Sequence, residues 1–129
     1  MPNSRGERVI RKLDVSSLTQ EQLAKTIDHA VLKPHSTEVQ IREGCSIALK
    51  YKVATITVNP CYVRLCADIL INSEAKVAAA IGFPLGANVP VIKKSEAQRA
   101  VEDGAAELDM VLNIGALKEG HYKYVREEI

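Results

Sequence analysis

Short apolar runs, rich in β-branched residues and alanine, alternate along the chain with longer stretches whose apolar residues recur every three or four positions. The short runs have the length and composition of strands, and the longer stretches have the periodicity of amphipathic helices. The predicted strands are residues 26–32, 53–59, 76–81 and 107–113. The helical stripe in the first long stretch is Ile41, Cys45, Ala48 and Leu49. The order β-α-β-α-β-α-β-α predicts parallel strands joined by right-handed crossovers.

Local signals at the ends of these elements support the same order. Ser36 or Thr37 can cap the helix that follows the first strand, and Gly104 stands where a helix C-cap glycine belongs. The helix before Gly104 is expected to turn small apolar residues inward, Val101 among them. After the last strand, residues 115–120 are expected to form a connection that leads into one more helix.

The last predicted strand differs from the others because it carries acids on one face. In extended backbone, alternate side chains point to opposite sides. One side then has Glu107, Asp109, Val111 and Asn113, and the other has Leu108, Met110 and Leu112. A carboxylate on such a strand needs water, a partner or a chemical role. Taken alone, the segment fits equally well a half-exposed strand whose acids are solvated.

The composition agrees with an α/β domain and argues against several classes of function. The 129 residues fit one domain, and 47% are hydrophobic although the only aromatics are one Phe and four Tyr. Such a core is built from small aliphatic side chains. The formal net charge of +1 gives no electrostatic case for binding nucleic acid or an anionic membrane. No apolar run approaches the roughly 20 residues of a membrane span.

The three cysteines, Cys45, Cys61 and Cys66, together with the lack of a signal peptide, predict a reducing, cytoplasmic setting. Each cysteine is expected to be a small buried apolar residue, and Cys61 is expected to pack at the start of a helix. The spacing of Cys61 and Cys66 is not that of a metal-ligand pair, and the three histidines fall on different elements. No metal site is predicted.

Four βα units leave two parallel architectures open, a flavodoxin-like sheet and part of a (β/α)₈ barrel. No glycine-rich nucleotide loop is present to favour a nucleotide fold. In either architecture the active site lies at the carboxyl ends of the strands. Polar residues follow the predicted strands at that edge, for example Lys33, Asn59 and Asn113.

Asp28, Thr57 and Asp109 are the residues best placed for chemistry on the polar faces of these strands. A carboxylate held beside hydroxyl groups can transfer protons, because burial and neighbouring groups set its pKa. Such a group cannot break a carbon–carbon bond by itself. That reaction also needs an electrophile, either a metal or a lysine that forms a Schiff base.

Five segments occur in a fixed order along the chain, namely TIDHAVLKP at 26–34, VNP at 58–60, IGFPLGA at 81–87, AVEDGA at 100–105 and ELDMVLNIGALK at 107–118. Together they resemble deoxyribose-phosphate aldolase. The resemblance implies the first four βα units of a TIM (β/α)₈ barrel at residues 19–129, after a flexible arm at residues 1–18. It also implies a class I aldehyde-lyase without metal or cofactor. Such an enzyme reversibly cleaves 2-deoxy-D-ribose 5-phosphate to glyceraldehyde 3-phosphate and acetaldehyde in deoxyribose catabolism.

The resemblance assigns roles by position. Asp109 matches the family's proton donor and acceptor on the fourth strand, and Asp28 matches the aspartate of the first-strand motif. Thr57 stands where many members have an active-site cysteine, so it keeps polarity without thiol reactivity. Asn113 and Lys33, both near strand ends, are expected to bind substrate or to support the site.

The family's covalent machinery has no counterpart in this sequence. In the family, the Schiff-base lysine lies on the sixth strand in a Lys-Thr-Ser-Thr-Gly segment, a second lysine lies on the seventh strand, and phosphate-binding loops follow. The chain is therefore expected to lack the C-terminal half of the barrel and to be inactive alone. Most of its own lysines, Lys93 among them, are expected to be solvated, and Lys33 is the one nearest a strand end.

A half barrel would also have two edge strands with unpaired backbone groups. We therefore expect the chain to self-associate or to pair with the missing half barrel, with a small phosphosugar as its substrate. Two alternatives remain open at this stage. One is a non-catalytic half-barrel module for binding or assembly, and the other is a different phosphosugar enzyme with a small β/α fold.

Overall fold

A computed structural model describes residues 15–129, so most of the predicted N-terminal arm, residues 1–18, lies outside the described residues. The strands are β1 (Asp28–Val31), β2 (Thr55–Val58), β3 (Lys76–Ile81) and β4 (Glu107–Met110). The α-helices are α1 (Gln20–Ala24), α2 (Glu38–Tyr51), α3 (Val63–Ile69), α4 (Pro90–Glu102), α5 (Ile114–Lys118) and α6 (Tyr122–Glu128). Two short 3₁₀ segments are η1 (Val15–Ser17) and η2 (Pro60–Tyr62).

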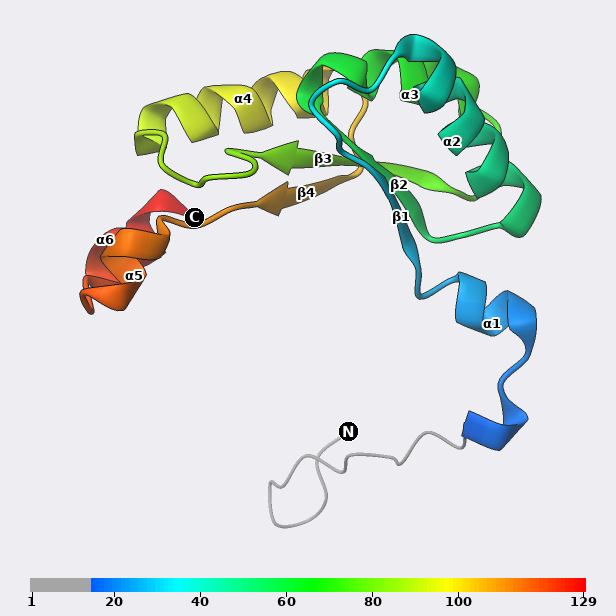
Figure 1. Ribbon diagram of the computed structural model, residues 1–129, viewed down its shortest axis with the longest axis horizontal. Helices are drawn as coiled ribbons and strands as arrows, with labels where there is room; N and C mark the ends of the chain where they lie inside the picture. The colour runs from blue at the N-terminus through cyan, green and yellow to red at the C-terminus, as the bar shows by residue number, and fades with distance from the viewer. Residues whose placement is uncertain (1–14) are drawn as a thin grey trace.

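The four strands form one parallel sheet in the order β1-β2-β3-β4 (Figure 1). A doubly wound sheet would reverse its strand order at a switch point and carry helices on both faces. Here the order never reverses, and α2, α3 and α4 all lie on the same side of the sheet (Figure 1). The prediction of four barrel-type βα units is therefore confirmed, and the flavodoxin-like alternative is wrong.

The helix-covered face of the sheet holds the hydrophobic core. Strand residues that alternate toward the helices meet small apolar residues of α2, α3 and α4, and the buried cluster includes Ile41, Cys45, Ala48, Ile56, Val58, Val63, Cys66, Val77, Ala79, Ile81 and Ala100. Burying one side chain the size of valine or isoleucine contributes about 1.5–3 kcal/mol. This layer is therefore the main source of stability in the chain.

Polar caps and one glycine define the ends of the helices over this core. Thr37 begins α2 with a capping box, in which its side chain accepts from the Gln40 amide and the Gln40 side chain accepts from the Thr37 amide. Gly104 ends the turn after α4 with φ +104°, and a Cβ there would lie 2.7 Å from the Ala67 Cβ. The predicted roles of Thr37 and Gly104 are both confirmed.

The opposite face of the sheet carries no helix among residues 15–129 (Figure 1). Strand alternation and the sheet register place a mostly polar set on this open face, namely Asp28, Ala30, Thr55, Thr57, Lys76, Ala78, Ala80, Glu107 and Asp109. The alanines of β3 are short, and they leave space between the polar side chains of β2 and those of β4. The predicted division into an acidic and an apolar face is confirmed for Glu107–Met110.

The region after β4 differs from the prediction. Regular strand pairing ends at Met110 rather than at residue 113, and a helix, α5, occupies most of the segment predicted to be a connection. The cause is Asn113, whose side-chain oxygen accepts a hydrogen bond from the Ala116 amide at 3.0 Å and so begins a helical turn. Asn113, predicted to be the last residue of the strand, is instead the N-cap of α5.

Three apolar residues predicted to be buried are exposed. Leu49 lies at the margin of the stripe on α2, and Val101 borders a groove that no element covers within the described residues. Cys61 lies in η2, ahead of the first buried position of α3, and its side chain is exposed, whereas Cys45 and Cys66 are buried as expected.

Candidate active site

A hollow of about 340 Å³ lies on the open face of the sheet, near the carboxyl ends of its strands. It is bounded by β2, β3 and β4, by the end of the β1 segment and by the loop after β3. The residues that line it are Leu32, Thr57, Ala80, Phe83, Leu108, Asp109, Met110 and Val111. Of the five residues predicted for the site, the structure brings Asp109 and Thr57 together here.

Asp109 reaches this hollow because of its place in the sheet. It is paired with Ala80 of β3, and both side chains point to the open face. The methyl group of Ala80 is too small to fill the space in front of the carboxylate. Asp109 is exposed, so its carboxylate can be reached by a small molecule from the open side.

Thr57 supplies an unusual polar group on the same hollow. Its side chain is 3% exposed, yet its hydroxyl oxygen has no hydrogen-bond partner among the described residues. Buried hydroxyl groups are almost always bonded, and each exception needs an explanation such as a bound water or a ligand. Thr57 is among the residues that line the hollow, although its hydroxyl oxygen has almost no exposed surface of its own.

Asp28 lies on the same face but at the other end of the strands. Its carboxylate accepts a hydrogen bond from the Thr55 hydroxyl at 2.7 Å, and the two residues are level in the β1–β2 pairing. Asp28 begins β1, whereas the hollow is at the carboxyl ends, so the structure separates it from Asp109 by most of the strand length. In this chain Asp28 ties the first two strands together.

The two remaining predicted residues lie elsewhere. Lys33 is exposed and lines a separate hollow between β1 and α2. Asn113 uses its side-chain oxygen to cap α5 and its backbone amide to bond Glu128. Neither side chain is among those that line the hollow of Asp109.

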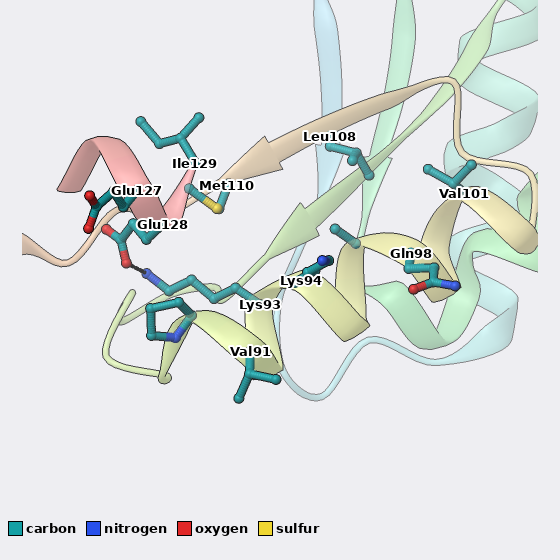
Figure 2. Close-up of a pocket in the computed structure, with 12 residues that line it drawn as sticks. Val91, Lys93, Lys94, Gln98, Val101, Leu108, Met110, Glu127, Glu128 and Ile129 are labelled. Atoms are coloured by element: carbon teal, nitrogen blue, oxygen red, sulfur yellow. Dashed lines mark hydrogen bonds and ion pairs between the residues drawn. The ribbon is translucent and has the colours of Figure 1, made fainter. Parts of the chain in front are cut away.

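A larger hollow, of about 720 Å³, lies on the other side of β4, between that strand, α4 and α6 (Figure 2). Its walls are mainly apolar, with Val91, Val101, Leu108, Met110 and Ile129 among them. The buried polar groups at one end of this groove, Lys93 and Glu128, are bonded to each other. The groove is the larger of the two hollows, but its buried charged groups are already paired. The hollow of Asp109 has polar side chains that no other described residue engages, so we take it as the candidate active site.

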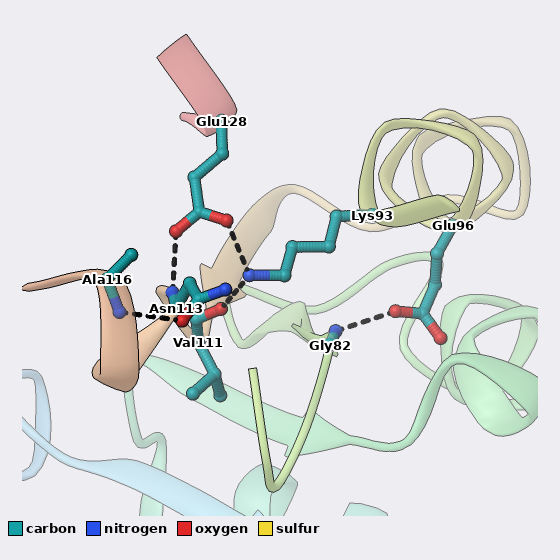
Figure 3. A network of polar contacts seen from close by, with 7 residues as sticks. All are labelled: Gly82, Lys93, Glu96, Val111, Asn113, Ala116 and Glu128. Carbon is teal, nitrogen blue, oxygen red and sulfur yellow. Dashed lines mark hydrogen bonds and ion pairs between the residues drawn. The ribbon is translucent and has the colours of Figure 1, made fainter. Parts of the chain in front are cut away.

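Lys93 contradicts its predicted solvation. Its side chain is fully buried, and its ammonium donates to the Val111 carbonyl and to Glu128 Oε2, each at 2.8 Å (Figure 3). Glu128 Oε1 accepts from the Asn113 amide at 2.6 Å. The sequence does contain a signal for this burial, since Lys93 precedes the inward-facing Ala97 and Ala100 by four and seven residues, the spacing of a helical stripe.

Opposing effects set the pKa of Glu128. Burial raises it, but the hydrogen bonds from Lys93 and from the Asn113 amide, with the positive charge of Lys93, outweigh burial and hold the pKa below its usual value. The Glu128 carboxyl group is therefore ionised at neutral pH. A lysine nucleophile must be a neutral amine, so an ammonium engaged by two acceptors is unsuited to form a Schiff base.

The described residues form neither a metal-binding cluster nor a membrane-spanning helix. Within residues 15–129, no three or more His, Cys, Asp or Glu side chains gather in an arrangement that could hold a metal ion. No helix in the same range combines the length and the apolar character needed to cross a bilayer.

The arrangement in the hollow suits proton transfer to or from a bound molecule. An accessible carboxylate stands on one strand, an unpartnered hydroxyl on another, and the side chain of Phe83 contributes an apolar wall. No lysine is among the residues that line the hollow.

Known proteins resemble this chain in sequence and in fold. No family model matches the sequence. The deoxyribose-phosphate aldolase of Caldicellulosiruptor saccharolyticus is 51% identical over 112 residues, which are 87% of this chain and 51% of that protein. The solved structure of QR15, an aldolase, superposes with a TM-score of 0.76 at 43% identity, over 81% of this chain and 47% of its own.

A second solved structure, the tetrameric deoxyribose phosphate aldolase of Aeropyrum pernix, has a TM-score of 0.71 at 30% identity over 85% of this chain and 50% of that one. The chain thus spans about half the length of the curated relatives it matches. The aldolases that it resembles in structure are TIM barrels, as the order of strands and helices in this chain predicts. With this fold and close to half of its aligned residues identical to those of curated relatives, the chain belongs to the deoxyribose-phosphate aldolase family.

Proposed function

We propose that this chain supplies the proton-transferring half of a deoxyribose-phosphate aldolase. The complete enzyme would reversibly cleave 2-deoxy-D-ribose 5-phosphate to glyceraldehyde 3-phosphate and acetaldehyde, as part of deoxyribose catabolism in the cytoplasm. In this proposal Asp109 is the proton donor and acceptor. Thr57 offers a hydroxyl to the bound sugar or to a water held beside it.

One observation carries the proposal, namely the accessible Asp109 carboxylate that shares a hollow with the unpartnered hydroxyl of Thr57. A general acid or base must lie within hydrogen-bond reach of the proton that it moves, and the open side of the hollow gives a substrate that access. The location supports the same role, since parallel βα folds place their active sites at the carboxyl ends of the strands.

The covalent half of the reaction is assigned to residues that this sequence does not contain. The resemblance places the Schiff-base lysine in a Lys-Thr-Ser-Thr-Gly segment, and no such segment occurs in the 129 residues. Lys93 is occupied by its ion pair, and Lys33 lies on another hollow. We therefore propose that the isolated chain is inactive as an aldolase.

The charges on the open face favour one kind of partner over another. Among the described strand residues on that face, Asp28, Glu107 and Asp109 oppose one cation, Lys76. Closure against a second copy would gather two such acidic faces in one interior, where unpaired charges cost several kcal/mol each. We propose instead that β1 and β4 pair with a complementary half barrel whose inner face is basic. The tetramer of the Aeropyrum pernix relative supports further association of complete barrels.

Complementation tests the proposal directly. This chain would be mixed with a separately produced polypeptide covering the remainder of the Caldicellulosiruptor saccharolyticus relative, and cleavage of 2-deoxy-D-ribose 5-phosphate would be measured. We expect activity from the mixture and none from either piece. Asp109→Asn should lower the rate by about 10²–10⁴-fold. Glu107→Gln, the matched change two residues earlier on the same face, should leave most of the rate intact.

Reductive trapping separates the proposal from its alternative. After incubation with acetaldehyde and treatment with borohydride, mass spectrometry should find no modified lysine in this chain alone and one in the complementing polypeptide. A stable complex of the two pieces with neither adduct nor activity would support the alternative, a non-catalytic half-barrel module. An adduct on Lys33 or Lys93 would contradict our assignment of the nucleophile.

A further inference from the structure

The chain leaves the sheet two residues after Asp109. Regular pairing of β4 with β3 ends at Met110, and the last backbone bond between them runs from the Val111 amide to the Ile81 carbonyl at 2.9 Å. Asp109 is thus the penultimate residue of a strand at the edge of the sheet. The sheet holds the backbone through the Val111 amide, so other contacts must fix the chain from the Val111 carbonyl onward.

Two buried side chains from distant helices fix that chain. Lys93 of α4 donates to the Val111 carbonyl, and Glu128 of α6 accepts from the Asn113 amide (Figure 3). The two side chains are joined by their own ion pair at 2.8 Å, and neither is exposed. Together they bond both sides of Leu112, so the exit of β4 is anchored to two helices at once.

The loop after β3 is shaped to fit this arrangement. Gly82 adopts φ +64°, and a Cβ there would lie 3.2 Å from the Cε of Lys93, so the lysine stem passes directly over the glycine. The Gly82 amide donates to Glu96 of the same helix at 2.7 Å. Gly86, also in the left-handed region, packs so closely on the Leu112 carbonyl that a side chain would collide with it.

We propose that Lys93 and Glu128 are positioning residues for Asp109, which set the direction of its carboxylate by anchoring the backbone at Val111 and Asn113. The inference rests on the proposed function, since the direction of a carboxylate matters for catalysis only if it moves a proton. Neither residue lines the hollow of Asp109, so they act through the backbone and not on the substrate. Positioning of this kind matters because small displacements of a catalytic group cost large factors in rate.

The test must distinguish a loss of the backbone bonds at Val111 and Asn113 from a general loss of stability. It does so by replacing both charged side chains of the ion pair in one variant. A buried ion pair replaced by apolar residues of similar size often leaves stability unchanged or improved. The double variant Lys93→Met with Glu128→Leu should therefore fold, but it can no longer bond Val111 and Asn113. The matched control is Lys94→Met with Glu127→Leu, in which each change lies one residue away on an exposed position.

Nuclear magnetic resonance of the purified chain reads both effects at once. In the test variant, amide exchange at Asn113 should accelerate by about tenfold or more, while the core amide of Ile56 stays protected. The carboxyl ¹³C signal of Asp109 should move, and that of Asp28 on the same face should not. The control variant should match the wild type at all four groups.

Two results would overturn the inference. One is an Asp109 signal that stays at its wild-type position while exchange at Asn113 rises, because the pair would then be purely structural. The other concerns Glu128→Gln, which keeps the side-chain shape and replaces the double variant if that does not fold. An Asp109 signal that stays at its wild-type position in Glu128→Gln would also overturn the inference. These readouts need no catalysis, so they stand even if complementation shows no aldolase activity.

Discussion

The two faces of the sheet differ in how fully their side chains are packed and hydrogen-bonded. On the helix-covered face, apolar side chains of β2 and β3 are packed under three helices with almost no exposure. On the open face, the buried Thr57 hydroxyl lacks a partner, and the carboxylate of Asp109 stands exposed above the alanines of β3. One face is a completed core, and the other leaves polar groups unused by the fold, which we propose for a ligand or a second half barrel.

The contrast shows where stability and function reside in this chain. Most residues that hold the fold are packed or paired on the covered side, including the ion pair of Lys93 with Glu128, and the bond between Thr55 and Asp28 is an exception on the open face. Residues assigned to chemistry are on the open side, where their bonding groups are not used by the fold. Substitutions should therefore fall into two classes, with large losses of stability on one side and small ones on the other.

The largest effect is expected from Lys93→Met. Loss of the ammonium would leave the Glu128 carboxylate buried without its counter-charge, and such a break typically costs about 3–5 kcal/mol of unfolding free energy. Urea denaturation followed by circular dichroism measures it. Lys94→Met, one residue later and exposed, should stay within about 0.5 kcal/mol of the wild type. Similar losses in both variants would mean that the buried pair contributes nothing special.

Ile56→Ala should produce the next largest effect. Ile56 is fully buried in β2 on the covered face, and truncating such a side chain removes apolar contacts and leaves a cavity, at a cost of about 2–5 kcal/mol. Ile71→Ala, at a position 77% exposed, should change stability by less than about 0.5 kcal/mol. A small loss at Ile56 would show that the covered face is not the main core.

Local pattern was sufficient to predict most of the covered face. The bounds of β3 were predicted correctly, because Lys76–Ile81 is an uninterrupted strand between turn residues. The stripe of α2 was correct at Ile41, Cys45 and Ala48 and failed at Leu49, which lies at its margin. Periodicity succeeds here because core packing repeats with the period of each element.

The polar features could not be predicted in the same way, because they depend on distant residues. The spacing of Lys93 to Ala97 and Ala100 indicates an inward position, but its partner Glu128 is 35 residues away, so the pattern within α4 does not show what satisfies the buried charge. The predicted site residues Asp109 and Thr57 come together because the strand order is sequential, whereas Asn113 was drawn into capping α5. Tertiary partners decide such cases, and a pattern within one segment does not contain them.

Acid should weaken the covered side through Glu128. Its pKa is depressed in the folded state, so its contribution to stability is fully present above the ordinary glutamate value of about 4.3 and is lost as pH falls through the lower folded value. Wild type and Glu128→Gln should therefore differ most near neutral pH and converge in acid. Asp103, whose pKa is lowered by its bonds to Arg99 and Arg64, keeps some acid sensitivity in both proteins. A difference that persists unchanged at low pH would contradict this assignment.

The smallest effect is expected on the open face, where two neighbouring threonines make a matched pair. Both are buried, but the Thr55 hydroxyl donates to Asp28 at 2.7 Å and the Thr57 hydroxyl has no partner within the described residues. Thr55→Val should cost about 1–3 kcal/mol, because the Asp28 carboxylate loses its bond. Thr57→Val should be neutral or should stabilise the chain by up to about 1 kcal/mol, because an unbonded hydroxyl is removed. Equal losses in thermal unfolding would mean that the Thr57 hydroxyl is already satisfied in the folded chain. It would then not be held ready for a ligand, and the hollow beside Asp109 would lose its second polar group.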